Sequence, residues 1–293
     1  MKKWLWRINK KKLDKSNLVN YSIFLNKRHN LHIRNSFLNL WKWSIENPKH
    51  FWNSIWDFTK IKGNKGNIVL KKSKIFYKNK FFPQAKLNYA QNILIKKNNK
   101  PAIIFKSENG YRTSITWKNL KLSVNRLSNW MKNNGIKKGD RVAAYLPNIP
   151  ETVTAYISTS TIGAVWSSCS PDFGVPGVIE RFSQIKPKIL FIGNEYFYNG
   201  KKINIFERLG EITKKIPSIK KIILIPYPGT EINTSTILKK NTLIWKNIII
   251  KKNRKKTKYV MSNFNDPLAI LYSSGTTGKP KCICHSVGGV LLQ

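Results

Sequence analysis

Short apolar runs alternate with helical patterns along residues 101–226, and this alternation restricts the fold more than any other feature of the sequence. Runs of this length, bounded by glycine, proline and polar residues, are typical of strands. We expect strands at 101–106, 140–145, 164–167, 187–192 and 222–226. We expect helices at 116–135, 150–163 and 176–184, the first of them ending at Gly135. Strands and helices in this order predict an α/β fold, with a parallel sheet covered by helices on both faces.

Residues 1–95 have a different pattern, which is helical and rich in tryptophan. Large apolar residues recur at roughly helical spacing from Leu38 to Phe58, interrupted by a turn at Glu46-Asn47-Pro48. We expect these aromatic side chains to pack in a core. Residues 60–67 are expected to form a linker, and the basic stretch 239–259 a surface connection. The sequence therefore predicts an N-terminal extension over residues 1–95 and a second domain over residues 96–293.

The chain is strongly basic, with 54 Lys and Arg against 13 Asp and Glu and a net charge of +41. A charge of this size attracts nucleic acid, and a basic nucleic-acid-binding protein is one hypothesis for its function. However, the lysines are spread along the whole chain and accompany an excess of Asn and Ile, whose codons are also rich in A and T. Compositional bias in the coding DNA explains all three together. We therefore expect no specific nucleic-acid partner, and interpret runs such as 10–12 and 251–258 as solvated surface.

The cysteines and the lengths of the apolar runs bear on the cellular compartment. Three cysteines, Cys169, Cys282 and Cys284, are too few for a disulfide framework, which favours a reducing environment. Cys282 and Cys284 are too close for an ordinary zinc pair, so we expect no metal site there. They would share one face of a strand as small buried side chains. Because no apolar run approaches the roughly 20 residues that span a bilayer, the expectation is a cytoplasmic protein without a membrane partner.

A small loop rich in hydroxyl groups and glycine follows the apolar run Leu268–Tyr272. Glycines let backbone N–H groups approach phosphate oxygens, hydroxyl groups donate hydrogen bonds to them, and a lysine neutralises their charge. The candidate phosphate-binding residues are Ser273, Ser274, Gly275, Thr276, Thr277, Gly278 and Lys281. Pro280 and the alternating pattern after it predict a strand–loop–strand hairpin, not the helix that follows a mononucleotide P-loop. The alternative is a polar turn that binds no ligand.

The string SSGTTGKPK at 273–281, with HSVGG at 285–289, resembles the signature loop of the AMP-forming acyl-CoA synthetases, a family of adenylate-forming enzymes. Residues 139–151 resemble the early core block of that family, and residues 81–92 (FFPQAKLNYAQN) resemble the extension before the core in members that activate short acids. The resemblance implies the N-terminal part of the family's large domain, built of layered α/β sheets with helices on both faces and preceded by a helical, Trp-rich extension.

The resemblance also implies a reaction in two steps that uses ATP, Mg²⁺ and coenzyme A. An acid is first joined to AMP with release of pyrophosphate, and coenzyme A then displaces AMP. Strings such as WSSCSPDFG at 166–174 and RFSQI at 181–185 favour acetoacetate as the acid, with acetate or propionate as alternatives. Lys201 and Lys202 match the place where relatives hold basic residues near the coenzyme A nucleotide. A solvated lysine pair is the other interpretation of these two residues.

Family members continue well beyond the phosphate loop, and the residues that carry their catalysis lie in that later part. We therefore expect no catalytic residue in this chain and interpret it as an N-terminal fragment that is not competent on its own. Two polar residues near the motifs are expected to be structural. His285 belongs to the strand after the loop, and Asp172 is expected to serve a turn after a strand.

Overall fold

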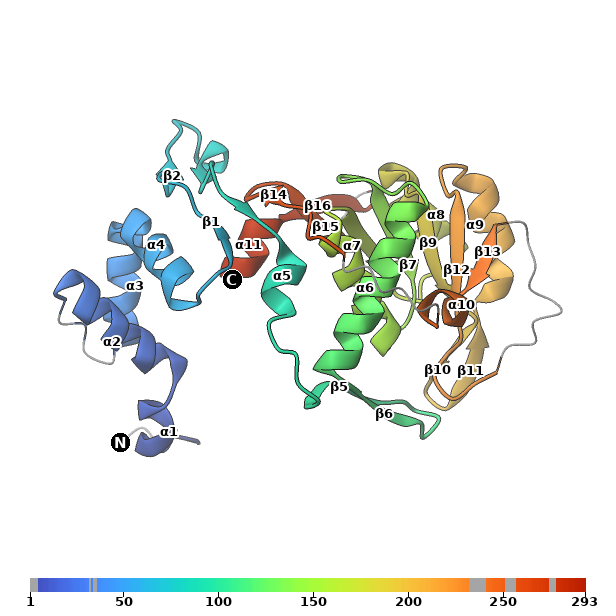
Figure 1. Ribbon diagram of the computed structural model, residues 1–293, viewed down its shortest axis with the longest axis horizontal. Coiled ribbons are helices and arrows are strands. Elements are labelled where there is room, and N and C mark those ends of the chain that lie inside the picture. Colours follow the sequence, from blue (N-terminus) through green and yellow to red (C-terminus); the bar gives the residue numbers. More distant parts are fainter. Residues whose placement is uncertain (1–4, 32, 34–35, 232–240, 251–256, 274–277) are drawn as a thin grey trace. The chain divides into compact units, whose positions relative to one another are not determined.

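The computed structural model describes residues 5–31, 33, 36–231, 241–250, 257–273 and 278–293. The chain forms two compact units. One contains residues 1–61, 65–85 and 292–293, and the other contains residues 62–64 and 86–291 (Figure 1). The predicted division at residues 95 and 96 stays a prediction. No helix among the described residues is long and apolar enough to cross a membrane.

The smaller unit is mainly helical. Its helices are α1 (Lys10–Asp14), α2 (Asn17–His29), α3 (Phe37–Glu46) and α4 (Pro48–Phe58), and β2 (Leu70–Lys71) pairs with β3 (Lys80–Phe81) around the 3₁₀ turn η1 (Phe76–Lys78). Ser16 and Ser36 cap α2 and α3, and Pro48 starts α4 at the position where its missing N–H costs nothing.

Aromatic side chains form the core of the smaller unit, as the sequence predicted. Tyr21, Leu25, Ile33 and Leu40 are buried, and Phe24, Trp43, Phe51 and Phe58 pack against them. The Tyr21 hydroxyl reaches Ser54 Oγ at 2.6 Å, so its polar end is satisfied inside the core. Trp41, by contrast, is 47% exposed, because it lies on the outer face of α3.

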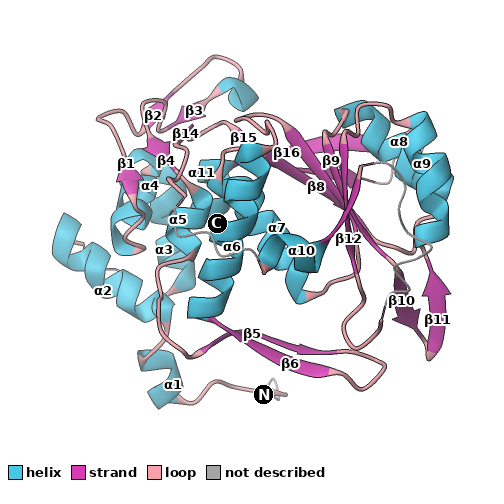
Figure 2. Cartoon of the chain, turned by 45° about the vertical axis from the view of Figure 1, so that its right-hand side comes forward, coloured by secondary structure: helices cyan, strands magenta, loops and turns pink. Residues whose placement is uncertain are grey.

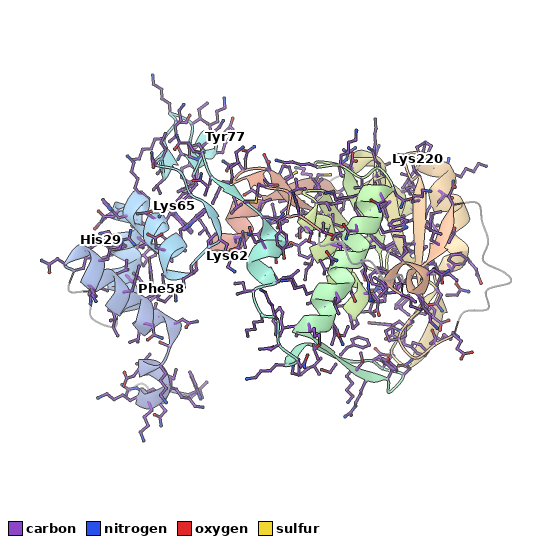
Figure 3. The ribbon with its side chains drawn as sticks, in the orientation of Figure 1. His29, Phe58, Lys62, Lys65, Tyr77 and Lys220 are labelled. Atoms are coloured by element: carbon purple, nitrogen blue, oxygen red, sulfur yellow. The ribbon has the colours of Figure 1, made fainter. Side chains whose placement is uncertain are left out.

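Asp57 connects two segments of the smaller unit through ion pairs. Its carboxylate lies 2.6 Å from Arg28 Nη1 and 2.7 Å from Lys65 Nζ, and Lys65 also donates to Asn53 Oδ1. Lys65 is labelled in Figure 3. Partial burial opposes ionisation, but the hydrogen bonds and charges of Lys65 and Arg28 outweigh it and hold the pKa of Asp57 below its usual value of 3.8. The ionised carboxylate therefore stabilises the folded state.

We expect Asp57→Asn to lower the free energy of unfolding by about 1 kcal/mol at pH 7. A carboxyl group whose pKa is lower in the folded state than in the unfolded state stabilises the fold at pH values above the unfolded-state pKa. That stabilisation is lost as the pH falls through the folded-state pKa. The effect should therefore disappear towards pH 3 in urea unfolding followed by tryptophan fluorescence. Asp14→Asn, at an exposed position, serves as the control and should change little. A loss that is the same at pH 3 and pH 7 would exclude the ion pairs as its cause.

The larger unit is built on a seven-stranded sheet with the order β13-β12-β9-β7-β8-β15-β16. The strands are β7 (Arg141–Tyr145), β8 (Val165–Cys169), β9 (Ile189–Gly193), β12 (Lys221–Ile225), β13 (Thr242–Ile244), β15 (Pro267–Ser273) and β16 (Lys281–Ser286). All neighbouring strands are parallel except β15 and β16, which are antiparallel. Residues 142–145 and 189–192 are fully buried, because helices cover both faces of these central strands.

The helices lie in two layers. Figure 2 shows α6 (Trp117–Asn133), α7 (Pro150–Thr161) and α10 (Trp245–Ile249) on one face of the sheet, and α8 (Val175–Ile185) and α9 (Leu209–Lys215) on the other. Thr116 caps α6, Pro150 starts α7, and Gly135 follows α6 with a φ of 80°. The predicted parallel α/β sheet with helices on both faces is therefore confirmed.

The remaining elements of the larger unit are small. They are α5 (Tyr89–Ile93), the hairpin β10 (Glu195–Tyr198) with β11 (Lys201–Asn204), the 3₁₀ turn η2 (Phe206–Arg208) and α11 (Val287–Leu292). A three-stranded sheet joins β1 (Gly63–Asn64), β4 (Lys86–Leu87) and β14 (Ser262–Asn263), so two residues of the expected linker are in a strand.

Three local predictions were wrong, because the place of a strand in a sheet is set by which strands become its neighbours. The strand predicted at 101–106 is β5 (Pro101–Lys106), but it pairs antiparallel with β6 (Arg112–Thr116) outside the main sheet. Segment 239–259 is not only a surface connection, because β13 adds an edge strand and α10 buries Ile248. Cys282 and Cys284 are exposed, since β16 is the last strand of the sheet in the described part of the chain.

Candidate functional site

The hairpin β15–β16 holds the predicted phosphate loop. Leu268, Ala269 and Ile270 are buried, and Ser167 Oγ on β8 donates to Ile270 O at 2.8 Å, which anchors β15 in the sheet. Ser273 and Lys281 are partners in the strand register, so they lie opposite each other where the two strands meet the loop. Ser274, Gly275, Thr276 and Thr277 lie outside the described residues. The predicted strand–loop–strand arrangement is confirmed.

Gly278 has a backbone conformation that side chains rarely adopt. Its φ is 102°, and no atom lies within 4 Å of the place where a Cβ would sit. Glycine is therefore required here by backbone geometry and not by lack of space. Gly278 is exposed, and the exposed side chain of Lys281 lies three residues further along the chain.

Helix α8 supports both strands of the hairpin. Gln184 Nε2 donates to Pro280 O at 3.0 Å, which fixes the chain directly before β16. On β15, the Tyr272 hydroxyl donates to Arg181 O at 3.1 Å and accepts from Ser167 Oγ at 3.1 Å. Burial raises the pKa of Tyr272, so its hydroxyl keeps its proton. The described residues that flank the loop, Tyr272 and Pro280, are thus held by α8 and β8.

Arg181 is a buried cation close to the hairpin. Its side chain stacks on Phe173, with Cζ 3.9 Å from the ring centroid, and lies 5.8 Å from the ring of Tyr272. Arg181 Nη1 donates to Gly177 O at 2.9 Å. Since Phe173 follows β8 and Tyr272 precedes the loop, Arg181 connects the two segments through cation–π contacts.

The segment after β8 is fixed by hydrogen bonds to backbone oxygens. Tyr145 OH at the end of β7 donates to Phe173 O at 2.6 Å and to Pro171 O at 3.0 Å. Arg208 Nη1 donates to Tyr145 OH and to the same two carbonyl oxygens. Asp172 accepts a hydrogen bond from Ser170 Oγ at 2.5 Å, which fits the turn predicted for it. The carboxyl ends of β7, β8 and β15 therefore meet at one edge of the sheet, where open α/β sheets bind ligands.

Lys201 and Lys202 lie on the hairpin β10–β11, which follows β9 at the same edge. Lys202 Nζ forms an ion pair with Glu195 Oε2 at 2.9 Å, while Lys201 is exposed opposite Tyr198. Strands β7 and β8 separate β9 from β15, so the structure does not bring these lysines into the phosphate loop. Their side chains differ in environment, because only Lys202 has a carboxylate partner among the interactions described for this hairpin.

The sequence prediction missed the supporting residues Tyr145, Arg181, Gln184 and Arg208. A signal was present for two of them, since Arg181 and Gln184 are three residues apart and share a face of α8. Arg181 stands in an apolar stripe with Val178, Phe182 and Ile185, all buried, which marks it as a buried cation. Among the described residues there is no group of three or more His, Cys, Asp or Glu that could hold a metal ion.

Comparisons with known proteins agree with this geometry. The family model described as AMP-binding enzyme matches residues 92–293. The chain is 38% identical over 251 residues to an acetoacetyl-coenzyme A synthetase of Rhizobium meliloti, covering 86% of this chain and 38% of the relative. It is 39% identical over 264 residues to an acetoacetyl-CoA synthetase of Xenopus tropicalis, covering 87% and 39%. The solved structure of an acetoacetyl-CoA synthetase from Streptomyces lividans matches with a TM-score of 0.90 and 30% identity, covering 99% of this chain and 44% of that one. The chain thus spans about two fifths of the length of these curated relatives.

Proposed function

Because the chain belongs to the family of AMP-binding enzymes, we propose that it binds MgATP at the β15–β16 hairpin and serves the ligation of acetoacetate to coenzyme A. The observation that carries the proposal is the hairpin itself. Its glycine-rich loop lies between Ser273 and Lys281, at the edge of the sheet where the strands β7, β8 and β15 end. The choice of acetoacetate rests on the curated relatives, seven of which are named for it and are 34–39% identical to this chain.

The chemistry has two group-transfer steps. A carboxylate oxygen of acetoacetate attacks the α-phosphorus of ATP, the bond to the β-phosphate oxygen breaks, and pyrophosphate leaves with that electron pair. The thiol sulfur of coenzyme A then attacks the acyl carbon and loses its proton, and AMP leaves. Lys281, Ser273 and the loop residues Ser274, Gly275, Thr276, Thr277 and Gly278 would hold the β- and γ-phosphates as their negative charge increases. Mg²⁺ arrives with ATP and neutralises part of that charge.

We propose different roles for Lys201 and Lys202, the two lysines of the β10–β11 hairpin. Lys201 is exposed and would contact a phosphate of coenzyme A directly. The side chain of Lys202 pairs with Glu195, so its charge is largely balanced before any ligand arrives. Of the two, Lys201 is therefore the residue we assign to coenzyme A.

Exchange of labelled pyrophosphate into ATP tests the proposal on a full-length protein in which the later part of the family, expected to carry the catalytic residues, follows these 293 residues. We expect exchange to require an acid and to be at least about tenfold faster with acetoacetate than with acetate or propionate, a difference of about 1.4 kcal/mol in the barrier. Faster exchange with acetate than with acetoacetate would show that the substrate is another short acid. Failure of the 293-residue chain to bind MgATP in calorimetry would overturn the nucleotide site itself. AMP serves as the control ligand, because it lacks the phosphates that the loop would hold.

A further inference from the structure

A second cavity in the larger unit lies away from the phosphate loop. Its volume is about 480 Å³, and its lining comes from the end of α5, the outer face of α6 and the segment 257–259. Thr161 at the end of α7 leads into β8, and Tyr259 precedes β14 and β15, so the cavity adjoins the region where these strands begin. The loop follows the far end of β15, about 20 Å away along seven strand residues. This cavity is therefore separate from the proposed nucleotide site.

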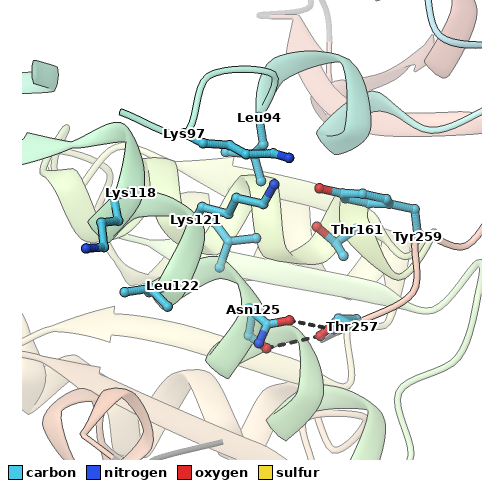
Figure 4. A pocket seen from close by; sticks show the side chains of 10 residues that line it. Leu94, Lys97, Lys118, Lys121, Leu122, Asn125, Thr161, Thr257 and Tyr259 are labelled. Atoms are coloured by element: carbon cyan, nitrogen blue, oxygen red, sulfur yellow. Dashed lines mark hydrogen bonds between the residues drawn. The ribbon is translucent and has the colours of Figure 1, made fainter. Parts of the chain in front are cut away.

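The wall formed by residues 257–260 is fixed on both sides. Asn125 Oδ1 accepts from Thr257 N at 2.5 Å, and the Thr257 hydroxyl donates to Asn125 O at 3.1 Å (Figure 4). Val260 N donates to Thr161 O at 3.0 Å, and Asn88 Nδ2 donates to Val260 O at 2.8 Å. Tyr259 is thus held between two hydrogen-bonded residues. The cavity is preformed, which lowers the entropic cost of binding a ligand.

The lining combines positive charge with apolar surface. Lys97, Lys118 and Lys121 are the charged residues among the described side chains that line the cavity, and no carboxylate is among them. Leu94, Leu122 and Val124 supply the apolar part. Figure 4 shows the amines of Lys97 and Lys121 directed towards the hydroxyl groups of Tyr259 and Thr161, whereas the amine of Lys118 points away from them. The Thr161 hydroxyl already donates to Ile157 O at 2.8 Å, so two cations and the Tyr259 hydroxyl converge beside an apolar floor.

We propose that this cavity binds a small amphipathic anion, a phosphate monoester or carboxylate with a short aliphatic chain. The anionic group would accept hydrogen bonds from Lys97 Nζ, Lys121 Nζ and the Tyr259 hydroxyl, and the chain would cover Leu122 and Val124. The volume is within the range of pockets that enclose small ligands, roughly 300–1,000 Å³. Burial raises the pKa of Tyr259, so its hydroxyl remains a hydrogen-bond donor. Nothing in the proposal depends on the nucleotide site.

Calorimetric titration of the chain with hexyl phosphate, at fixed ionic strength, tests this inference. We expect one site per chain that binds hexyl phosphate more tightly than inorganic phosphate or hexanol. Inorganic phosphate lacks the aliphatic chain, and hexanol lacks the anionic group. Lys97→Ala and Lys121→Ala should each weaken binding about tenfold. Leu122→Ser, at a 45% exposed position, should weaken hexyl phosphate binding but not change the affinity for inorganic phosphate. Lys132→Ala removes the same charge from the last turn of α6 and is the matched control.

Several results would overturn the proposal. Equal weakening by Lys132→Ala and Lys121→Ala would reduce the binding to attraction by the net charge of +41. Binding of hexanol as tight as that of hexyl phosphate would exclude the anionic half of the ligand. Unchanged thermal unfolding curves of the variants exclude misfolding as the cause of any loss of affinity.

Lys281→Ala should still bind hexyl phosphate with unchanged affinity. Failure of the proposed nucleotide site and failure of this cavity therefore give different results.

Discussion

Replacing Lys281 with alanine, in a full-length protein that also carries the later catalytic part of the family, is expected to lower kcat/KM for MgATP about 100- to 1,000-fold in pyrophosphate exchange. Lys281 is exposed and begins β16 opposite Ser273, directly after the segment that we propose holds the β- and γ-phosphates. Negative charge on these phosphates increases as the α–β bond breaks, and a fixed positive charge stabilises that state more than the ground state. The loss should therefore fall mainly on kcat, with a smaller effect on KM.

Lys279→Ala is the matched control for this prediction. Lys279 is also exposed and lies two residues before Lys281, but it precedes β16 and has no partner in the strand register. We expect less than a fivefold change for Lys279→Ala, as for a peripheral charge. Lys281→Arg keeps the positive charge on a different geometry and should recover part of the activity. A larger loss of kcat/KM for Lys279→Ala than for Lys281→Ala would show that Lys279, and not Lys281, contacts the phosphates.

Replacing Asn88 with alanine is expected to lower the free energy of unfolding by about 3 kcal/mol. Asn88 is 1% exposed, and its Nδ2 donates to Ser160 O at 2.9 Å and to Val260 O at 2.8 Å, with a longer contact of 3.2 Å to Thr161 O. Its Oδ1 also accepts from Gln91 N at 3.1 Å and caps α5. Alanine would remove the side-chain donor to Val260 O, take one of two donors from Ser160 O and Thr161 O, and remove the helix cap. The lost hydrogen bonds and the lost cap each cost about 1 kcal/mol or more.

Chemical denaturation measures this loss, with Asn98→Ala as the control. Asn98 is exposed, and its side-chain Oδ1 accepts a local hydrogen bond from Lys100 N, so its replacement should change stability by less than about 0.5 kcal/mol. Asn88→Ser keeps a capping oxygen but lacks the amide N–H groups, and should lie between wild type and Asn88→Ala. A change below about 1 kcal/mol for Asn88→Ala would show that water replaces the lost donor. Hexyl phosphate affinity should also fall, since Asn88 fixes the wall of the second cavity.

Much of the larger unit could be predicted from its sequence, because local patterns report local structure. The buried runs at 141–145 and 189–193 are continuous and apolar, as strands covered on both faces must be. Thr116, Pro150 and Gly135 mark helix ends through hydrogen bonds and φ values that depend only on neighbouring residues. Pro280 excluded a helix after the loop, and the hairpin β15–β16 followed from the alternation beyond it. In these places the sequence contained both the element and the reason for it.

Contacts that no local sequence pattern specifies were decided only by the tertiary structure. The pairing of β5 with β6, the edge position of β13 and the exposure of Cys282 depend on which strands become neighbours. The ion pair of Lys202 with Glu195 and the stacking of Arg181 on Phe173 depend on side-chain positions set by chain reversals and by packing. Periodicity tells which face of a segment is buried, but the partner that buries it is selected by the packing of the whole unit. The sequence therefore determined the central strands and the β15–β16 hairpin, and the packed structure decided what supports that hairpin and where a second cavity forms.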